Sequence, residues 1–227
     1  MSAPILLDLS HTSHTRARTG IQRVARSLWR ELGAAATPIT YDPHQRTWRP
    51  LDAWETQNLA TDAFSKKRGA SWPVTAQLRG HTRRLLGSST LNAHLSAFKG
   101  SGLLLPELFT ANVAAQLPAL FAATTGPRAA VFHDAIALKF PELTPTKTVA
   151  RFPAYLRELL AFDGIAANSE DSRATLLAYW DWLGIPSKDR PVVTAIPLGI
   201  DAPAPVAQSA TRNSPLAACP SYLIFAP

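Results

Sequence analysis

The sequence predicts an α/β fold, a Rossmann-like, doubly wound domain on a mainly parallel sheet. Short apolar runs of strand length alternate along the chain with amphipathic segments of helical period. Hydrophobic residues make up 46% of the 227 residues and charged residues 17%. This composition supports a sizeable core and excludes a largely disordered protein. Apolar strands followed by helices are typical of a parallel sheet covered on both faces.

The first strand–helix unit occupies the N-terminal region. The run PILLDL at 4–9 has the length of a buried strand, and a polar stretch at 10–19 follows it. Thr19 and Gln22 have the spacing of a capping box, which predicts a helix beginning at Thr19–Gly20. Its apolar stripe at helical spacing consists of Ile21, Val24, Ala25, Leu28 and Leu32.

Four later segments are predicted to be strands of the same sheet. They are GLLL at 102–105, RAAVF at 128–132, GIAA at 164–167 and VVTAI at 192–196. Strand, loop and helix recur in this order, which is the building unit of a doubly wound domain.

Two helices are predicted between these strands. The first covers 111–123, and Pro118 is expected to kink or end it. The second begins after Ser169, whose side chain caps it, with Glu170 and Asp171 in its positive first turn. Gly184 is expected to end this helix.

The remaining segments lack a clear period or change composition. Residues 41–100 are interpreted only as helix and loop. Residues 1–200 are therefore taken as one Rossmann-like domain, 201–220 as an Ala-, Pro- and Ser-rich linker, and 221–227 as the first strand of a second domain.

Net charge and cysteine content indicate which class of binding partner and which cellular compartment to expect. The net charge of +7 and pI of about 10.0 favour an anionic partner. No nucleic-acid-binding tail or motif is present, so we expect no nucleic acid partner. Cys219 is the only cysteine, which excludes an intramolecular disulfide and favours a reducing compartment such as the cytoplasm.

A basic region suggests peripheral contact with a membrane. Its candidates for an acceptor- or membrane-facing surface are Lys66, Lys67, Arg68, Arg83 and Arg84. Such a cluster can contact anionic lipid head groups at the inner face of the membrane. The alternative interpretation is an ordinary solvated surface.

The loop before the first helix is a candidate anion site. Gly20 lies where a phosphate would meet free backbone N–H groups and the positive end of the helix dipole, next to Thr19. Neither G-x-G-x-x-G nor a P-loop is present. The alternative is that Gly20 is a flexible residue near a cap.

The pair His133–Asp134 follows the strand RAAVF, at the edge where doubly wound folds bind ligands. The imidazole could hydrogen-bond a sugar hydroxyl or a phosphate, and Asp134 could orient a ring or cap a turn. The alternative is a structural histidine. His11 and His14 have no third ligand nearby in the sequence, so no metal site is expected, and no G-x-S-x-G elbow indicates a hydrolase.

These motifs together resemble a known family. LLDLS, TGIQRVARSLWREL, VFHDAIALKFPE, FDGIAANSEDSRATL and IPLGID follow one another in an order that resembles the N-terminal domain of GT-B glycosyltransferases, specifically retaining family 4. The resemblance covers roughly 4–52 and 101–227. In that family two Rossmann-like domains face each other, the first mostly holding the acceptor and the second binding the nucleotide sugar.

The resemblance implies roles for individual residues. Gly20 and Thr19 would lie near the donor diphosphate, and His133 would reach the transferred sugar with Asp134 as its partner. Ser169 would lie at the cleft edge. The family often has paired glycines where Thr19 and Gly20 stand here. Its acidic E-x7-E element and its diphosphate-binding basic residues belong to the second domain.

The expected activity is therefore transfer of a sugar from a UDP- or GDP-sugar to a glycan or lipid-linked acceptor, with retention and without a metal or other cofactor. The 227 residues alone are expected to be inactive. One alternative is a non-catalytic glycan- or lipid-binding module that acts with a partner protein. Another is a different Rossmann-type enzyme, such as an epimerase or methyltransferase, although the glycine fingerprint is missing.

Overall fold

The computed structural model describes residues 4–61, 63, 65–66, 69–85, 94–196 and 199. The predicted linker at 201–220, the predicted strand at 221–227, Lys67 and Arg68 lie outside the described residues. Within the described part the fold is α/β and Rossmann-like, as predicted.

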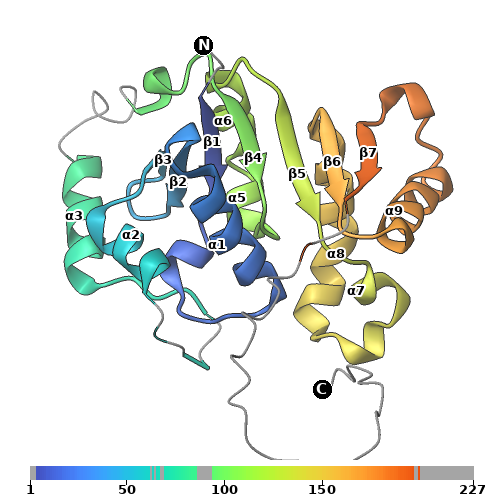
Figure 1. Ribbon diagram of the computed structural model, residues 1–227, viewed down its shortest axis with the longest axis horizontal. Coiled ribbons are helices and arrows are strands. Elements are labelled where there is room, and N and C mark those ends of the chain that lie inside the picture. Colours follow the sequence, from blue (N-terminus) through green and yellow to red (C-terminus); the bar gives the residue numbers. More distant parts are fainter. Residues whose placement is uncertain are drawn as a thin grey trace, which may run out of the picture.

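A mainly parallel sheet forms the centre of the molecule (Figure 1). Its order is β3-β2-β1-β4-β5-β6-β7, and each strand is parallel to its neighbours except β3, which pairs antiparallel with β2 at one edge. The strands are β1 Ile5–Asp8, β2 Ala36–Asp42, β3 Thr47–Pro50, β4 Gly102–Leu105, β5 Arg128–Phe132, β6 Gly164–Ala167 and β7 Val192–Ala195.

Helices connect the strands, except for β2 and β3, which follow each other directly. The α-helices are α1 Gly20–Leu32, α2 Ala53–Ala60, α3 Val74–Leu85, α5 Ala111–Ala114, α6 Leu117–Ala123, α7 Ile136–Lys139, α8 Thr146–Glu158 and α9 Glu170–Trp182. The 3-10 turns are η1 Thr12–His14, η2 Gly33–Ala35, η3 Pro141–Leu143, η4 Leu159–Ala161 and η5 Ser187–Asp189.

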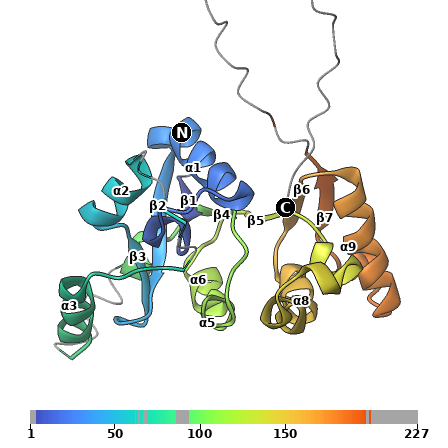
Figure 2. The same ribbon diagram turned by 90° about the horizontal axis from the view of Figure 1, so that it is seen from below.

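Each face of the sheet has its own core. Leu7 and Leu9 pack with Ala25 of α1 and Leu59 of α2 on one face. The other core joins the sheet to α5, α6, α8 and α9, and the indole of its buried Trp180 donates a 2.9 Å hydrogen bond to the carbonyl of Leu156. Figure 2 shows α1 and α2 on one side of the sheet and α5, α6 and α8 on the other.

The local helix signals act as predicted. Thr19 and Gln22 form a capping box at the start of α1, and Ser169 caps α9 by accepting from the backbone N–H of Ser172. Pro118 lies in the first turn of α6, so the predicted helix at 111–123 is divided in two. Gly184, with φ of +70°, follows the end of α9.

Candidate functional site

The sheet topology brings four strand–loop junctions to one edge. β1, β4, β5 and β6 are neighbouring parallel strands, so their carboxyl ends lie together. Polar residues follow each of them: Ser10 to His14 after β1, Glu107 after β4, His133 after β5 and Asn168 after β6. Ligands of doubly wound folds bind at this edge.

His133 is fixed by a hydrogen bond to the neighbouring strand connection. Its side chain is buried, and Nε2 lies 2.7 Å from the carbonyl oxygen of Pro106. Because a carbonyl oxygen can only accept, Nε2 carries the proton, and in the neutral imidazole Nδ1 is then an acceptor. His133 therefore offers a lone pair to a ligand donor.

Asp134 and Ser169 both contact the backbone of their own loops. Asp134 Oδ1 accepts from the N–H of Ile136 at 3.0 Å, which closes the turn into α7. Ser169 Oγ accepts from Ser172 N at 3.1 Å, and the Ser172 hydroxyl lies 3.2 Å from the carbonyl oxygen of His133. Capping is thus the role that the geometry gives to Asp134 and Ser169, and Ser172 connects α9 to the end of β5.

The start of α1 and the end of β5 border the same cavity. This cavity of about 350 Å³ is lined by Ile21 of α1, by His133 and Asp134, and by apolar residues that include Phe152 and Tyr155 of α8. The sequence-predicted residues Gly20 and His133, far apart in the chain, are therefore brought to one place: Gly20 directly precedes a lining residue, and His133 lines the cavity.

A second cavity, not anticipated from the sequence, lies at the carboxyl ends of β1, β2 and β4. It has a volume of about 150 Å³, and its lining includes Asp8, Glu107, Tyr41 and Trp72. Glu107 is buried and accepts from the backbone N–H groups of His11 and Thr12, each at 2.9 Å. It thereby holds the loop after β1 against the end of β4.

Asp8 is a buried acid at the base of this second cavity. Its Oδ1 accepts from the N–H of Ser10 at 3.0 Å and from the Ser10 hydroxyl at 2.5 Å. Burial, together with the charge of Glu107, raises the pKa of Asp8 to about 7, against the lowering effect of the Ser10 hydrogen bonds. The pKa of Asp8 thus lies far above that of an ordinary aspartate.

A buried ionic network anchors the loop between β1 and α1. Glu55 of α2 accepts from His14 Nε2 at 2.6 Å and from both terminal nitrogens of Arg49, which also reaches Asp42. Burial alone would raise the pKa of Glu55, but the hydrogen bonds from His14 and Arg49 hold it below its ordinary value. Both His14 ring nitrogens are used, because Nδ1 lies 2.7 Å from the carbonyl oxygen of Ser10.

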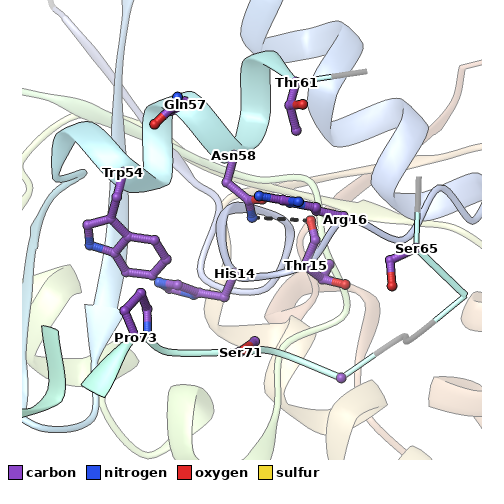
Figure 3. Close-up of a pocket in the computed structure, with 11 residues that line it drawn as sticks. His14, Thr15, Arg16, Trp54, Gln57, Asn58, Thr61, Ser65, Ser71 and Pro73 are labelled. Carbon is purple, nitrogen blue, oxygen red and sulfur yellow. Dashed lines mark hydrogen bonds between the residues drawn. The ribbon is translucent and has the colours of Figure 1, made fainter. Parts of the chain in front are cut away.

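A third cavity, of about 520 Å³, lies beside α2 (Figure 3). His14 and Trp54 form one wall, and Ser65 and Ser71 also line the cavity. Asn58 fixes its floor by donating to the carbonyl oxygens of Ser13 and Thr15. The residues predicted to carry chemistry, His133 and Gly20, do not line this cavity.

The basic residues predicted to face an acceptor or membrane are only partly described. Lys66, Arg83 and Arg84 are exposed, the two arginines at the end of α3. Arg83 also borders a cavity together with Arg49 and His94. These residues lie on other elements than His133 and Gly20, and they do not line the cavity at the end of β5.

Two features are absent from the described residues. Within this part of the chain, no helix is long and apolar enough to cross a membrane. In the same residues, no group of three or more His, Cys, Asp or Glu side chains is placed to hold a metal ion.

Comparison with known proteins gives no match: no protein-family model, no curated protein and no solved structure is significantly similar to this chain.

Proposed function

We propose that this chain is the acceptor-side domain of a retaining, nucleotide-sugar-dependent glycosyltransferase of the GT-B type. The reaction would move a sugar from a UDP- or GDP-sugar to a glycan or lipid-linked acceptor. One observation carries the proposal: Ile21, next to Gly20 at the start of α1, and His133 at the end of β5 line the same cavity. A site of this kind needs a phosphate-binding element beside a sugar-binding element.

The start of α1 supplies the phosphate-binding element. The first backbone N–H groups of a helix have no acceptor within the helix, and the helix dipole favours an anion there. A Cβ atom added to Gly20 would meet no atom within 4 Å, and its φ is not positive, so the fold itself does not require glycine. Close approach of a ligand phosphate to the backbone is a reason for glycine at this position.

His133 supplies the sugar-binding element. Since Nε2 donates to Pro106, neutral Nδ1 can accept a hydrogen bond from a hydroxyl of the donor sugar. We assign His133 the task of holding the donor sugar in a reactive orientation. The apolar wall formed by Phe152 and Tyr155 excludes water from one side of the cavity and strengthens this hydrogen bond.

The donor-binding half expected from the resemblance has no counterpart in the described residues, which form one sheet. We therefore expect no sugar transfer by the 227-residue chain alone. The test uses a protein in which this chain is joined to a donor-binding half, called the two-domain protein below. In that protein His133→Ala should lower kcat for sugar transfer by about 100-fold, because a misplaced donor sugar reacts slowly.

The matched control is His81→Ala, at an exposed position of α3. It should leave the transfer rate within about twofold of the wild type, since surface substitutions have little effect. Turnover of nucleotide sugar by His133→Ala at the wild-type rate would remove His133 from the mechanism. If neither the wild type nor either variant turns over any UDP- or GDP-sugar, the proposed function itself is wrong.

A further inference from the structure

We propose that the cavity at the carboxyl ends of β1, β2 and β4 binds a single uncharged, hydroxyl-rich ring, a pyranose sugar. Its lining includes the acids Asp8 and Glu107 and the aromatic residues Tyr41, Trp72 and Phe109. This cavity is separate from the one that contains His133. Taking the bound sugar as the reacting unit of the acceptor rests on the proposed function.

The size of the cavity limits the ligand to one small ring. A volume of about 150 Å³ corresponds to the space of roughly five liquid water molecules. Pockets for drug-sized ligands start at about 300 Å³, so a nucleotide or a disaccharide cannot enter whole. A longer glycan would place only its terminal ring inside.

The chemistry of the lining suits a molecule with one apolar and one polar side. The lining contains aromatic and aliphatic side chains as well as the carboxyl, hydroxyl and amide groups of Asp8, Ser10 and Asn112. A pyranose presents C–H groups on its faces and hydroxyl groups at its edge. The lining therefore offers apolar contacts for the faces of the ring and hydrogen-bond partners for its hydroxyl groups.

Asp8 is the buried polar group that points to a ligand. It is 2% exposed, and its hydrogen bonds to other described residues all reach Oδ1, which leaves Oδ2 for a molecule in the cavity. A carboxyl group whose pKa lies near 7 can both accept from a hydroxyl and, when protonated, donate to one. Sugar hydroxyls make the same pair of hydrogen bonds in return.

The charges in the cavity exclude an anionic ligand. Two carboxyl groups line it, and none of the lining residues is lysine or arginine. A phosphate or a uronic acid would have to approach Glu107 and Asp8 with His11 as the only lining side chain that can carry a positive charge, at a cost in free energy. An uncharged sugar meets no such penalty.

The cavity for the sugar lies next to the cavity that contains His133. Leu108 lines both this cavity and the cavity that contains His133, so the two lie on either side of the same residue. A sugar in the smaller cavity would thus be held next to the place proposed for the donor sugar. This adjacency is the arrangement that transfer between two sugars requires.

The experiment measures binding of methyl hexopyranosides to the 227-residue chain by saturation-transfer NMR, without any nucleotide. The panel contains neutral methyl glucoside, galactoside and mannoside, the anionic methyl glucuronide and the cationic methyl glucosaminide. Asn112→Trp is chosen to fill the mouth, because Asn112 is exposed and lines the cavity. Ala119→Trp is the matched control, an exposed position on α6 outside this lining.

We expect at least one neutral hexoside to bind, and its signal to fall at least fivefold in Asn112→Trp and to persist in Ala119→Trp. Preference for the glucuronide or the glucosaminide, binding that Asn112→Trp leaves intact, or no binding at all would each overturn the inference. Hexoside binding without nucleotide-sugar turnover by the two-domain protein would support this cavity and refute the proposed transferase. Turnover of nucleotide sugar by the two-domain protein, without hexoside binding to the 227-residue chain, would support the proposed transferase and refute this cavity as a sugar site.

Discussion

Replacing Asp8 by asparagine should change how the stability of the protein depends on pH. Asp8 is fully buried beside Glu107, and its pKa in the folded protein is about 7 against 3.8 for an ordinary aspartate. Asparagine keeps the shape of the side chain and the oxygen that accepts from Ser10. It removes only the titrating proton and the negative charge, so the difference between the two proteins isolates the titration of Asp8.

The sign follows from counting protons. The unfolded chain has lost the Asp8 proton above about pH 4, whereas the folded protein keeps it up to about pH 7. Between these values the unfolded state binds fewer protons, so the free energy of unfolding falls as the pH rises, by about 1.36 kcal/mol per unit. From pH 5 to pH 8 the wild type should therefore lose roughly 2–3 kcal/mol more than Asp8→Asn, by the same linkage relation.

The assay is urea denaturation at pH 5, 6, 7 and 8, followed by tryptophan fluorescence, since the chain has six tryptophans. Other groups titrate in this range, and those distant from Asp8 do so equally in both proteins and cancel in the difference. A difference that stays within about 0.5 kcal/mol across the range, or one of opposite sign, would show that Asp8 is not a buried acid with a raised pKa.

Two further substitutions test the start of α1 and the buried ionic network around Glu55. Gly20→Ala should leave the free energy of unfolding unchanged or raise it by up to about 1 kcal/mol, because the site has open space and a negative φ. The same substitution should weaken nucleotide-sugar binding by the two-domain protein about tenfold. Unchanged binding, measured by calorimetry, would show that Gly20 does not contact the phosphate. Glu55→Gln should cost roughly 3 kcal/mol, since it removes the charged acceptor of Arg49 and His14, while Asp42 still pairs with Arg49. The control Asp163→Asn breaks the exposed pair with Arg128 and should cost about 1 kcal/mol or less; equal losses in urea denaturation would contradict this difference.

The sequence predicted those parts of the fold that local patterns determine. Strands such as RAAVF and GIAA are continuous apolar runs, and the caps at Thr19 and Ser169 depend on residues three positions apart. β2 and β3 were not predicted, although β2 pairs with β1 from Ala36 to Ile39. β2 contains Pro38, which interrupts a strand signal, and β3 is an edge strand whose residues have no period of their own.

The candidate site was predictable only in part. His133 and Gly20 could be found because each follows or precedes a recognisable element, but their shared cavity depends on the sheet order. Asp8 and Glu107 lie 99 positions apart, and no local pattern links them. A carboxylate inside the apolar run PILLDL was the available signal, since an acidic side chain in a buried strand needs a reason.

The hydrogen bonds of His133 could not be read from the sequence either. Pro106 belongs to the connection after β4, and only the pairing of β4 with β5 brings its carbonyl oxygen to Nε2. This bond determines which ring nitrogen is free for a ligand. The expected partnership of His133 with Asp134 gave no hint of it, because Asp134 bonds its own turn.

The most direct test of the account is hydrogen–deuterium exchange of the two-domain protein with and without a UDP- or GDP-sugar. A donor bound in the cavity at the end of β5 should slow exchange at the start of α1, around 20–23, and at 133–136 after β5. Residues 54–60 of α2, beside the cavity in Figure 3, should remain unchanged. Protection of α2 with no change at 20–23 and 133–136 would place the ligand elsewhere and contradict the proposed site.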